Sequence, residues 1–104
     1  MPVVGTITAI IENVFRDKCI EVQITDQVQC DCLMAQLEVM IDHMKMQLMH
    51  PFSYNPCISI KLDQYDCLEE FKALIGKEVV IRYRLEPYKN GSNLNIKLTS
   101  IEEK

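Results

Sequence analysis

The stretch that decides the fold is VVIRYRLEPYKNGSNLNIKLTSI, residues 79–101. Two runs rich in β-branched and aromatic residues flank Asn90-Gly91, which fits a type I′ turn because both central residues of that turn need positive φ. With this pair at the turn centre, the numbers of facing residues sum to 181. The predicted pairs are Arg82 with Thr99, Tyr83 with Leu98, Arg84 with Lys97, Leu85 with Ile96, Glu86 with Asn95, Pro87 with Leu94 and Tyr88 with Asn93. This register separates an apolar face from a polar one, which supports a β-hairpin.

The polar face of this hairpin carries three basic residues, Arg82, Arg84 and Lys97. Arg84 faces Lys97, a like-charge pair that is unfavourable by up to about 1 kcal/mol. Cations beside an aromatic ring and amides suit a phosphate backbone with a stacked base. Exposed strands also carry basic residues simply to block edge-to-edge association, and Glu86, diagonal to Lys97, neutralises part of the charge. Ligand binding and edge protection both remain open from the sequence.

The first third of the chain predicts a meander of three strands. Residues 3–15 are rich in Val, Ile and Thr and predict one long strand, followed by a turn at 15–18. Residues 19–25 alternate between apolar and polar side chains, which predicts a second strand. The alternation continues through 28–32 and predicts a third.

Two helices follow from the spacing of apolar residues. From Leu33 the apolar period becomes helical, which predicts a helix ending near His50, before Pro51. Alternation over 57–62 then predicts another strand with its even-numbered residues inward.

The second predicted helix carries end signals. Asp66 is expected as its N-cap, with Glu69 completing a capping box, and Gly76 as its C-terminal cap. The residues expected to form its buried face are Leu68, Phe71, Leu74 and Ile75.

The order of a three-strand meander, a helix and a terminal hairpin resembles the OB-fold, a five-stranded partly open barrel. The matching parts are 3–33 and 68–101. The resemblance implies a mainly β protein with two helices, in the α+β class, forming a small OB-like β-barrel of five to six strands. Residues 1–104 would form a single OB-like domain, with 34–62 as a possible helix-strand insertion, unless the fold is a different small barrel.

The resemblance also implies where a ligand would bind. OB-folds bind oligonucleotides and oligosaccharides across the second and third strands, between two loops. The loops in those places hold an aromatic residue and cations, suited to stacking on bases and neutralising phosphates. The predicted nucleic-acid-binding residues are Phe15, Arg16, Lys18, Arg82, Arg84, Tyr88, Lys89, Asn93, Asn95 and Lys97. The function expected is therefore a non-catalytic binding domain for single-stranded nucleic acid.

Acidic residues favour a second interpretation. Glu21 and Asp31 lie on the predicted platform between the loops and would repel phosphate, and the formal net charge is −4. The alternative is an interaction or scaffold subunit that binds a protein partner or a second copy of itself. Methionine surfaces adapt to partners. Met34, Met46 and Met49 lie off the apolar stripe of the first predicted helix and are the predicted interface residues.

Cysteines and histidines offer a weak metal-site pattern. Cys30 and Cys32 would share one strand face, with His43, His50 and Cys57 available to complete a zinc site. The spacing matches neither C-x2-C nor H-x3-H, and cysteine is among the most buried residue types. Structural thiols are therefore expected, with a metal or redox role as the alternatives.

No residue set indicates catalysis. The chain has three glycines, so it lacks a glycine-rich phosphate loop, and no serine lies in a nucleophile-elbow pattern. The chain is therefore expected to be neither an enzyme nor a cofactor-binding protein.

The expected compartment is the reducing cytoplasm. The five cysteines are an odd number, and the start of the chain lacks the basic flank and apolar core of a signal peptide. No apolar run approaches the length of a membrane span, so no membrane association is expected.

Overall fold

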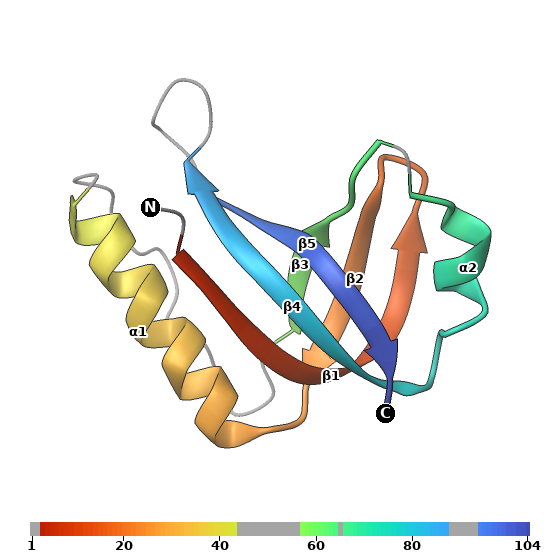
Figure 1. Cartoon of the computed structure of the whole chain (residues 1–104), viewed down its shortest axis with the longest axis horizontal. Helices are drawn as coiled ribbons and strands as arrows, with labels where there is room; N and C mark the ends of the chain where they lie inside the picture. The colour runs from red at the N-terminus through yellow and green to blue at the C-terminus, as the bar shows by residue number, and fades with distance from the viewer. Residues whose placement is uncertain (1–2, 44–56, 65, 88–93) are drawn as a thin grey trace.

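The computed structural model describes residues 3–43, 57–64, 66–87 and 94–104 (Figure 1). Within them the elements are, in chain order, β1 (Val3–Phe15), β2 (Cys19–Ile24), α1 (Gln27–His43), β3 (Cys57–Lys61), α2 (Leu68–Lys72), β4 (Glu78–Pro87) and β5 (Leu94–Glu103). This mainly β composition with two helices confirms the predicted α+β class. Neither described helix has the length and apolar character that a membrane span requires.

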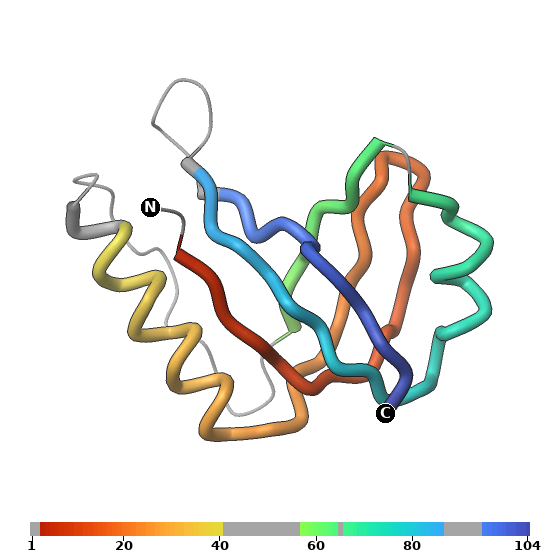
Figure 2. The backbone as a smooth tube through the Cα atoms, viewed as in Figure 1, coloured from red at the N-terminus to blue at the C-terminus, as the bar shows by residue number. Residues whose placement is uncertain are grey.

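The five described strands form one sheet that closes on itself in the order β1-β2-β3-β5-β4 (Figures 1 and 2). The long strand β1 makes the closure possible. It pairs with β4 from Val3 to Ile10 and with β2 from Ala9 to Phe15. All strand pairs are antiparallel except β3 with β5, which is parallel. A connection between parallel neighbours needs a long crossover, and here α2 and β4 lie between the two strands along the chain.

The core lies inside the closed sheet and follows the alternation of its strands. Strands expose one residue and bury the next, and Ile20, Val22 and Ile24 are buried as predicted. The same holds for Ile58 and Ile60 of β3. The largest fully buried side chains are those of Tyr83, Ile7, Ile11, Ile20, Leu33, Ile60, Ile81, Leu85, Val22 and Val79.

The predicted third strand over 28–32 is wrong, because these residues belong to α1. The Asp26 carboxylate accepts a hydrogen bond from the Gln29 backbone N–H at 3.0 Å, the usual N-cap interaction. From there Cys30 and Leu33 turn toward the core, whereas Val28 is 72% exposed. The end predicted near His50 lies outside the described residues.

The second predicted helix exists, but its expected N-cap is wrong. Cys67 occupies the N-cap position of α2 without a side-chain cap. The Asp66 carboxylate instead accepts a hydrogen bond from the Asp63 backbone N–H at 2.8 Å. Phe71 is buried as expected, but Ile75 is 44% exposed.

Gly76 is not the C-cap predicted for the second helix, because Ala73 occupies that position of α2. Gly76 instead ends the turn that follows α2, in a left-handed conformation. Its φ is +86°, a value that glycine adopts without steric cost. Its N–H donates to the Ile11 carbonyl at 2.8 Å, which fixes the segment after α2 to β1.

The hairpin of β4 and β5 keeps the predicted register over half of its length. The five pairs from Tyr83–Leu98 to Pro87–Leu94 are confirmed. A register shift between Arg82 and Tyr83 places Arg82 opposite Ser100, so the predicted partner Thr99 is wrong. A β-bulge inserts an extra residue in this way. The predicted turn at Asn90-Gly91 lies outside the described residues.

A tyrosine joins the sheet to α1. The buried Tyr83 hydroxyl donates to Gln36 Oε1 at 2.6 Å, and Gln36 Nε2 donates to the Val4 carbonyl at 3.0 Å. The ring of Tyr83 lies against Gly5, where a Cβ atom would overlap with the phenol oxygen and its carbon. One further glutamine, Gln29, accepts a hydrogen bond from the backbone N–H of β1. The two glutamines therefore hold α1 along the part of β1 that has no β2 partner.

We expect Gly5→Ala to lower the free energy of unfolding by about 1–3 kcal/mol, the usual cost of overpacking a filled core. The added methyl group has to displace the Tyr83 ring, which β4 and Gln36 hold. Urea unfolding measures the change. Val4→Ala, at the exposed neighbouring position, is the control and should change stability by less than about 0.5 kcal/mol. Equal effects of the two substitutions would contradict the close packing at Gly5.

The buried hydroxyl of Tyr83 gives a test at alkaline pH. Burial, with a smaller effect of the nearby Cys32 thiol, raises the pKa of Tyr83 to about 12, whereas an unfolded tyrosine titrates near 10. Above pH 10 the unfolded state therefore releases a proton that the folded state keeps. We expect stability to fall by about 1.4 kcal/mol per pH unit between about pH 10 and 12.

The control is Tyr83→Phe, because all other alkaline groups are the same in both proteins. The difference in unfolding free energy between wild type and variant should shrink as pH rises from 10 to 12. A difference that stays constant over this range would show that Tyr83 is not buried as described.

Candidate functional site

A row of five register partners crosses the outer face of the sheet. Phe15 of β1 pairs with Cys19 of β2, and Cys19 pairs with Lys61 of β3. Lys61 pairs with Lys97 of β5, and Lys97 pairs with Arg84 of β4. The residues next to them along each strand point into the core, so these five side chains share the outer face. Adjacent strands lie about 4.8 Å apart, so the row spans about 19 Å along the sheet.

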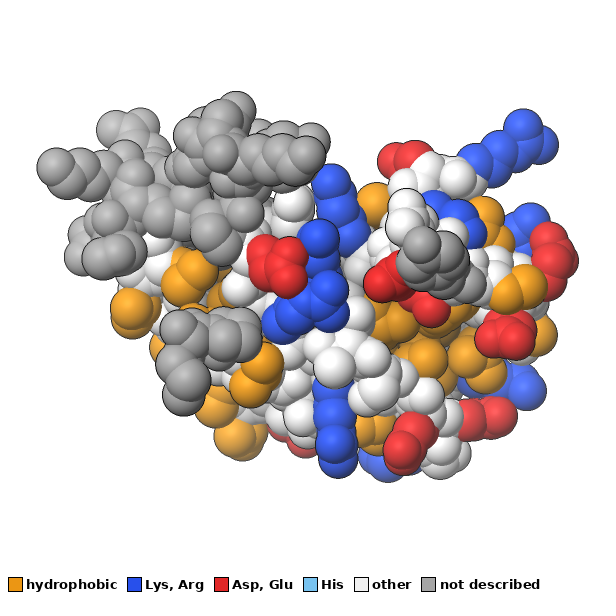
Figure 3. All heavy atoms as spheres, turned by 45° about the horizontal axis from the view of Figure 1, so that its top comes forward, with side chains coloured by type: hydrophobic (Ala, Val, Ile, Leu, Met, Phe, Trp, Pro, Cys, Tyr) orange, Lys and Arg blue, Asp and Glu red, His pale blue; other side chains and the backbone are white. Residues whose placement is uncertain are grey.

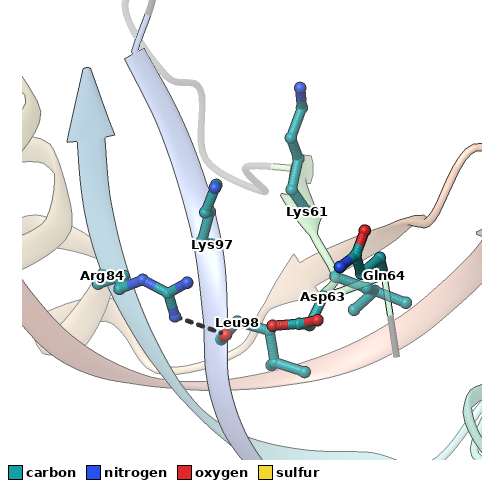
Figure 4. Close-up of a pocket in the computed structure, with 7 residues that line it drawn as sticks. Lys61, Asp63, Gln64, Arg84, Lys97 and Leu98 are labelled. Atoms are coloured by element: carbon teal, nitrogen blue, oxygen red, sulfur yellow. Dashed lines mark hydrogen bonds between the residues drawn. The ribbon is translucent and has the colours of Figure 1, made fainter. Parts of the chain in front are cut away.

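Three neighbouring members of this row are cations, and we call Lys61, Lys97 and Arg84 the cationic row. They line a hollow of about 340 Å³, together with Leu62, Asp63, Gln64 and Leu98. Figure 4 shows the Lys61 and Lys97 side chains extending in the same direction from adjacent strands. In Figure 3, Lys and Arg side chains form a band down the middle of the face turned to the viewer.

Glu86 partly neutralises the cationic row. Its carboxylate accepts from Arg84 Nε at 2.6 Å and from Lys97 Nζ at 3.0 Å. The hydrogen bond from Arg84, followed by that from Lys97, lowers the pKa of Glu86. A further guanidinium nitrogen, Nη1, donates to the Leu98 carbonyl at 3.1 Å (Figure 4). Arg84 is thus held in place, and its charge and that of Lys97 are shared with one carboxylate.

The turn between β1 and β2 lies beside the hollow. The Lys18 carbonyl accepts from the backbone N–H of Leu62, which lines the hollow, at 2.8 Å. The Lys18 ammonium donates to the Asp66 carbonyl. Phe15, at the start of this turn, is 42% exposed, and Arg16 is exposed.

The structure brings together only some of the predicted binding residues. Arg84 and Lys97 line the hollow, Phe15 lies in the same row, and Arg16 and Lys18 lie in the adjacent turn. Asn95 is the register partner of Glu86, and this pair lies two residues along the strands from Lys97 and Arg84. Arg82 lines a separate hollow beside Tyr83 and Thr99. The predicted residues Tyr88, Lys89 and Asn93 lie outside the described residues.

Lys61 belongs to the site and was not predicted. Its position depends on the parallel pairing of β3 with β5, which joins residues far apart in the chain. The only signal in the sequence is that Lys61 is the outward residue at the end of an alternating strand.

The acidic platform expected between the loops is wrong in one of its two members. Asp31 lies on α1, not on a strand of the sheet. Glu21 does lie on the outer face of β2, where its carboxylate accepts from Asn13 Nδ2 at 2.9 Å. Beside Glu21 the neighbouring strand presents Ser59, with Lys61 two residues further on. The outer face of β2 and β3 is therefore less acidic than the sequence suggested.

The predicted methionine interface is described at one of its three positions. Met34 is half-buried and packs against the core. Met46 and Met49 lie outside the described residues.

The cysteines considered for zinc do not converge. Cys30 and Cys32 are two residues apart on a helix, and Cys30 is buried while Cys32 is exposed. Burial, and secondarily the adjacent Asp31 carboxylate, raises the pKa of Cys30, which disfavours the thiolate that binds metal. Among the described residues no three His, Cys, Asp or Glu side chains form a group suited to a metal ion.

Comparison with known proteins gives no relative: no protein-family model, no curated protein and no solved structure matches the chain. The function therefore has to be inferred from the chemistry of the outer face.

Glu86→Gln tests the electrostatics of the cationic row. Removing the carboxylate leaves Arg84 opposite Lys97 without their shared partner, so the free energy of unfolding should fall at pH 7. These side chains are about one-third exposed, so the loss should stay below about 1 kcal/mol. The double variant Glu86→Gln/Lys97→Met should regain part of it, because the like-charge pair is then gone.

The same variant has a defined pH dependence. The folded pKa of Glu86 is lowered, so its stabilising effect is present above the unfolded value of about 4.3 and is lost as pH falls through the folded pKa. The stabilities of wild type and Glu86→Gln should therefore begin to converge as pH falls below the unfolded value of about 4.3 in urea titrations, and the difference should be lost below the folded pKa. A gap that persists at acid pH would contradict this role of Glu86.

Proposed function

We propose that this chain is an OB-type domain that binds single-stranded nucleic acid along the cationic row and catalyses no reaction. The observation that carries the proposal is the placement of Lys61, Lys97 and Arg84 on three adjacent strands beside a hollow. The closed five-stranded sheet supports the OB-type assignment, since the OB-fold is a five-stranded Greek-key barrel that binds oligonucleotides.

Closure of the sheet weighs against the simplest alternative for these cations. Lys and Arg on an edge strand discourage association with other sheets. Here β5 has β3 on one side and β4 on the other, and β4 also pairs with β1. Neither strand that carries Arg84 or Lys97 is an edge of the sheet, so edge protection does not explain the two cations.

The geometry supports a division of labour along the row. Lys61 and Lys97 extend in parallel and present two ammonium groups to a phosphate backbone, which is the main source of affinity for nucleic acids (Figure 4). Phe15, two strands away from Lys61 and half-exposed, offers a ring on which a base can stack. Base stacking on an aromatic side chain contributes about 1–3 kcal/mol and requires an unpaired strand.

Lys97→Ala should weaken binding of a fluorescent oligothymidylate about tenfold at low salt, the effect of losing one charge-assisted contact of about 1.4 kcal/mol. The slope of log K against log salt should become shallower by about 0.7, as for one lost phosphate contact on a single strand. Fluorescence anisotropy over a salt series measures both. The matched control is Lys72→Ala, which removes the same charge from α2.

Glu86→Gln changes binding in the opposite direction. It frees Arg84 and Lys97 from their internal counter-ion, so affinity should rise and the salt slope should steepen.

Phe15→Ala should weaken binding while leaving the salt slope unchanged, because a ring contributes no charge. The proposal fails if wild type shows no binding at about 100 μM, the weak limit of non-specific binding, or if Lys72→Ala acts like Lys97→Ala.

A further inference from the structure

Helix α1 carries apolar side chains on two opposite faces. One face packs against the core through Cys30, Leu33 and Leu37. The other face presents a line of four small apolar residues, which we call the outer stripe. It consists of Val28, Cys32, Ala35 and Val39, all exposed. A helix that covers a sheet needs only one apolar face, so folding of this chain does not explain the outer stripe.

The outer stripe is narrow and continuous. Its members follow one another at spacings of four, three and four residues, the spacing of the a and d positions in a coiled coil. At 3.6 residues per turn they lie within about 60° of one another around the helix. Val28 and Val39 at the two ends are 72% and 69% exposed. Isolated exposed apolar residues are normal, but a contiguous patch indicates an interaction site.

One side of the outer stripe borders an apolar groove against β1. The groove has a volume of about 270 Å³ and is lined by Val3, Ala35, Gln36, Val39 and Met40. Figure 1 shows α1 lying alongside β1. Because Gln36 is bonded to both Val4 and Tyr83, this wall of the groove is fixed. Side chains that pack on the stripe therefore have a preformed place to insert.

The other side of the outer stripe is acidic. Asp31 and Glu38 lie seven residues apart on this flank and are both exposed. Asp31 accepts a hydrogen bond from the neutral amide of Gln27 at 2.8 Å. Within the described part of the chain, neither carboxylate forms a salt bridge with a Lys or Arg. A complementary surface would carry cations beside its apolar residues.

We propose that the outer stripe of α1 docks an amphipathic helix of another protein, with an apolar seam flanked by Lys or Arg. The seam spacing fits a second helix, and the flank of Asp31 and Glu38 fits its basic edge. This surface uses none of the side chains assigned to nucleic-acid binding, so the inference stands apart from that function. It lies on the same helix as Met34 of the predicted methionine interface but does not include that residue.

A second copy of the chain fits less well. Two copies packed antiparallel around a two-fold axis would place the acidic flank of one α1 against the acidic flank of the other. Packed parallel, the acidic flank would meet Gln29 and Gln36, which are neutral and already bonded to β1. An anionic membrane surface would be repelled by the same carboxylates. Only a partner with cations satisfies both features of the surface.

The test uses the full chain and two synthetic helical peptides of about five turns. Both carry leucines at the seam positions; one has lysines on the flanks and the other has glutamates. Fluorescence anisotropy should show binding of the lysine peptide and at least tenfold weaker binding of the glutamate peptide. The double variant Val28→Gln/Val39→Gln, which leaves the net charge unchanged, should weaken binding of the lysine peptide at least tenfold. Lys97→Ala should leave binding of the lysine peptide unchanged.

Reversing the charge of the acidic flank tests whether this flank selects the partner. Asp31→Lys/Glu38→Lys should reverse the preference, so that the glutamate peptide binds more tightly. Far-UV circular dichroism checks that each variant is folded, and all four substituted positions are exposed. The proposal is overturned if the valine variant binds like wild type, or if charge reversal leaves the preference unchanged. It is also overturned if light scattering shows a dimer that Val28→Gln/Val39→Gln dissociates.

Discussion

The parallel contact between β3 and β5 is the constraint on which the remainder of the structure depends. It closes the sheet, and it places Lys61 directly beside Lys97. Two like charges on adjacent strands are unfavourable, and Arg84 on the next strand adds a third cation. The chain tolerates this concentration because Glu86 accepts hydrogen bonds from both Arg84 and Lys97. Closure of the sheet therefore brings the three cations together, and Glu86 limits the cost of the Arg84–Lys97 pair.

Features that depend on local periodicity could be read from the sequence. The strands over 3–15 and 19–24 and the register from Tyr83 to Pro87 require only alternation and a turn signal. The strand predicted over 28–32 was wrong because a short apolar pattern does not distinguish a strand from a short stretch of helix. The N-cap at Asp26 was the signal that separates the two. The bulge opposite Arg82 and Tyr83 has no comparable signal in the sequence. Its extra residue, Thr99, lies in β5, and a bulge bends the strand that carries it.

Errors in secondary structure carried over into the predicted site. Arg84 and Lys97 were found because their pairing is fixed within one hairpin. Lys61 was missed because its neighbour is set by chain closure and not by any nearby residue. Asp31 is predicted on the binding face only because the alternation over 28–32 predicts a strand there. Correcting one element thus removed a carboxylate from the outer face, while the parallel pairing added a cation to it.

Helix α1, which begins earlier than the sequence pattern predicts, also connects the two proposed surfaces through its hydrogen bonds to β1 and β4. Gln36 bonds to the Val4 carbonyl and to Tyr83, and Val4 is the register partner of Arg84. The end of the cationic row and the groove beside the outer stripe therefore share the same fixed backbone. A surface that is already ordered binds without the entropic cost of ordering it. Binding at either proposed surface would therefore cost less ordering of the protein than binding at a loop.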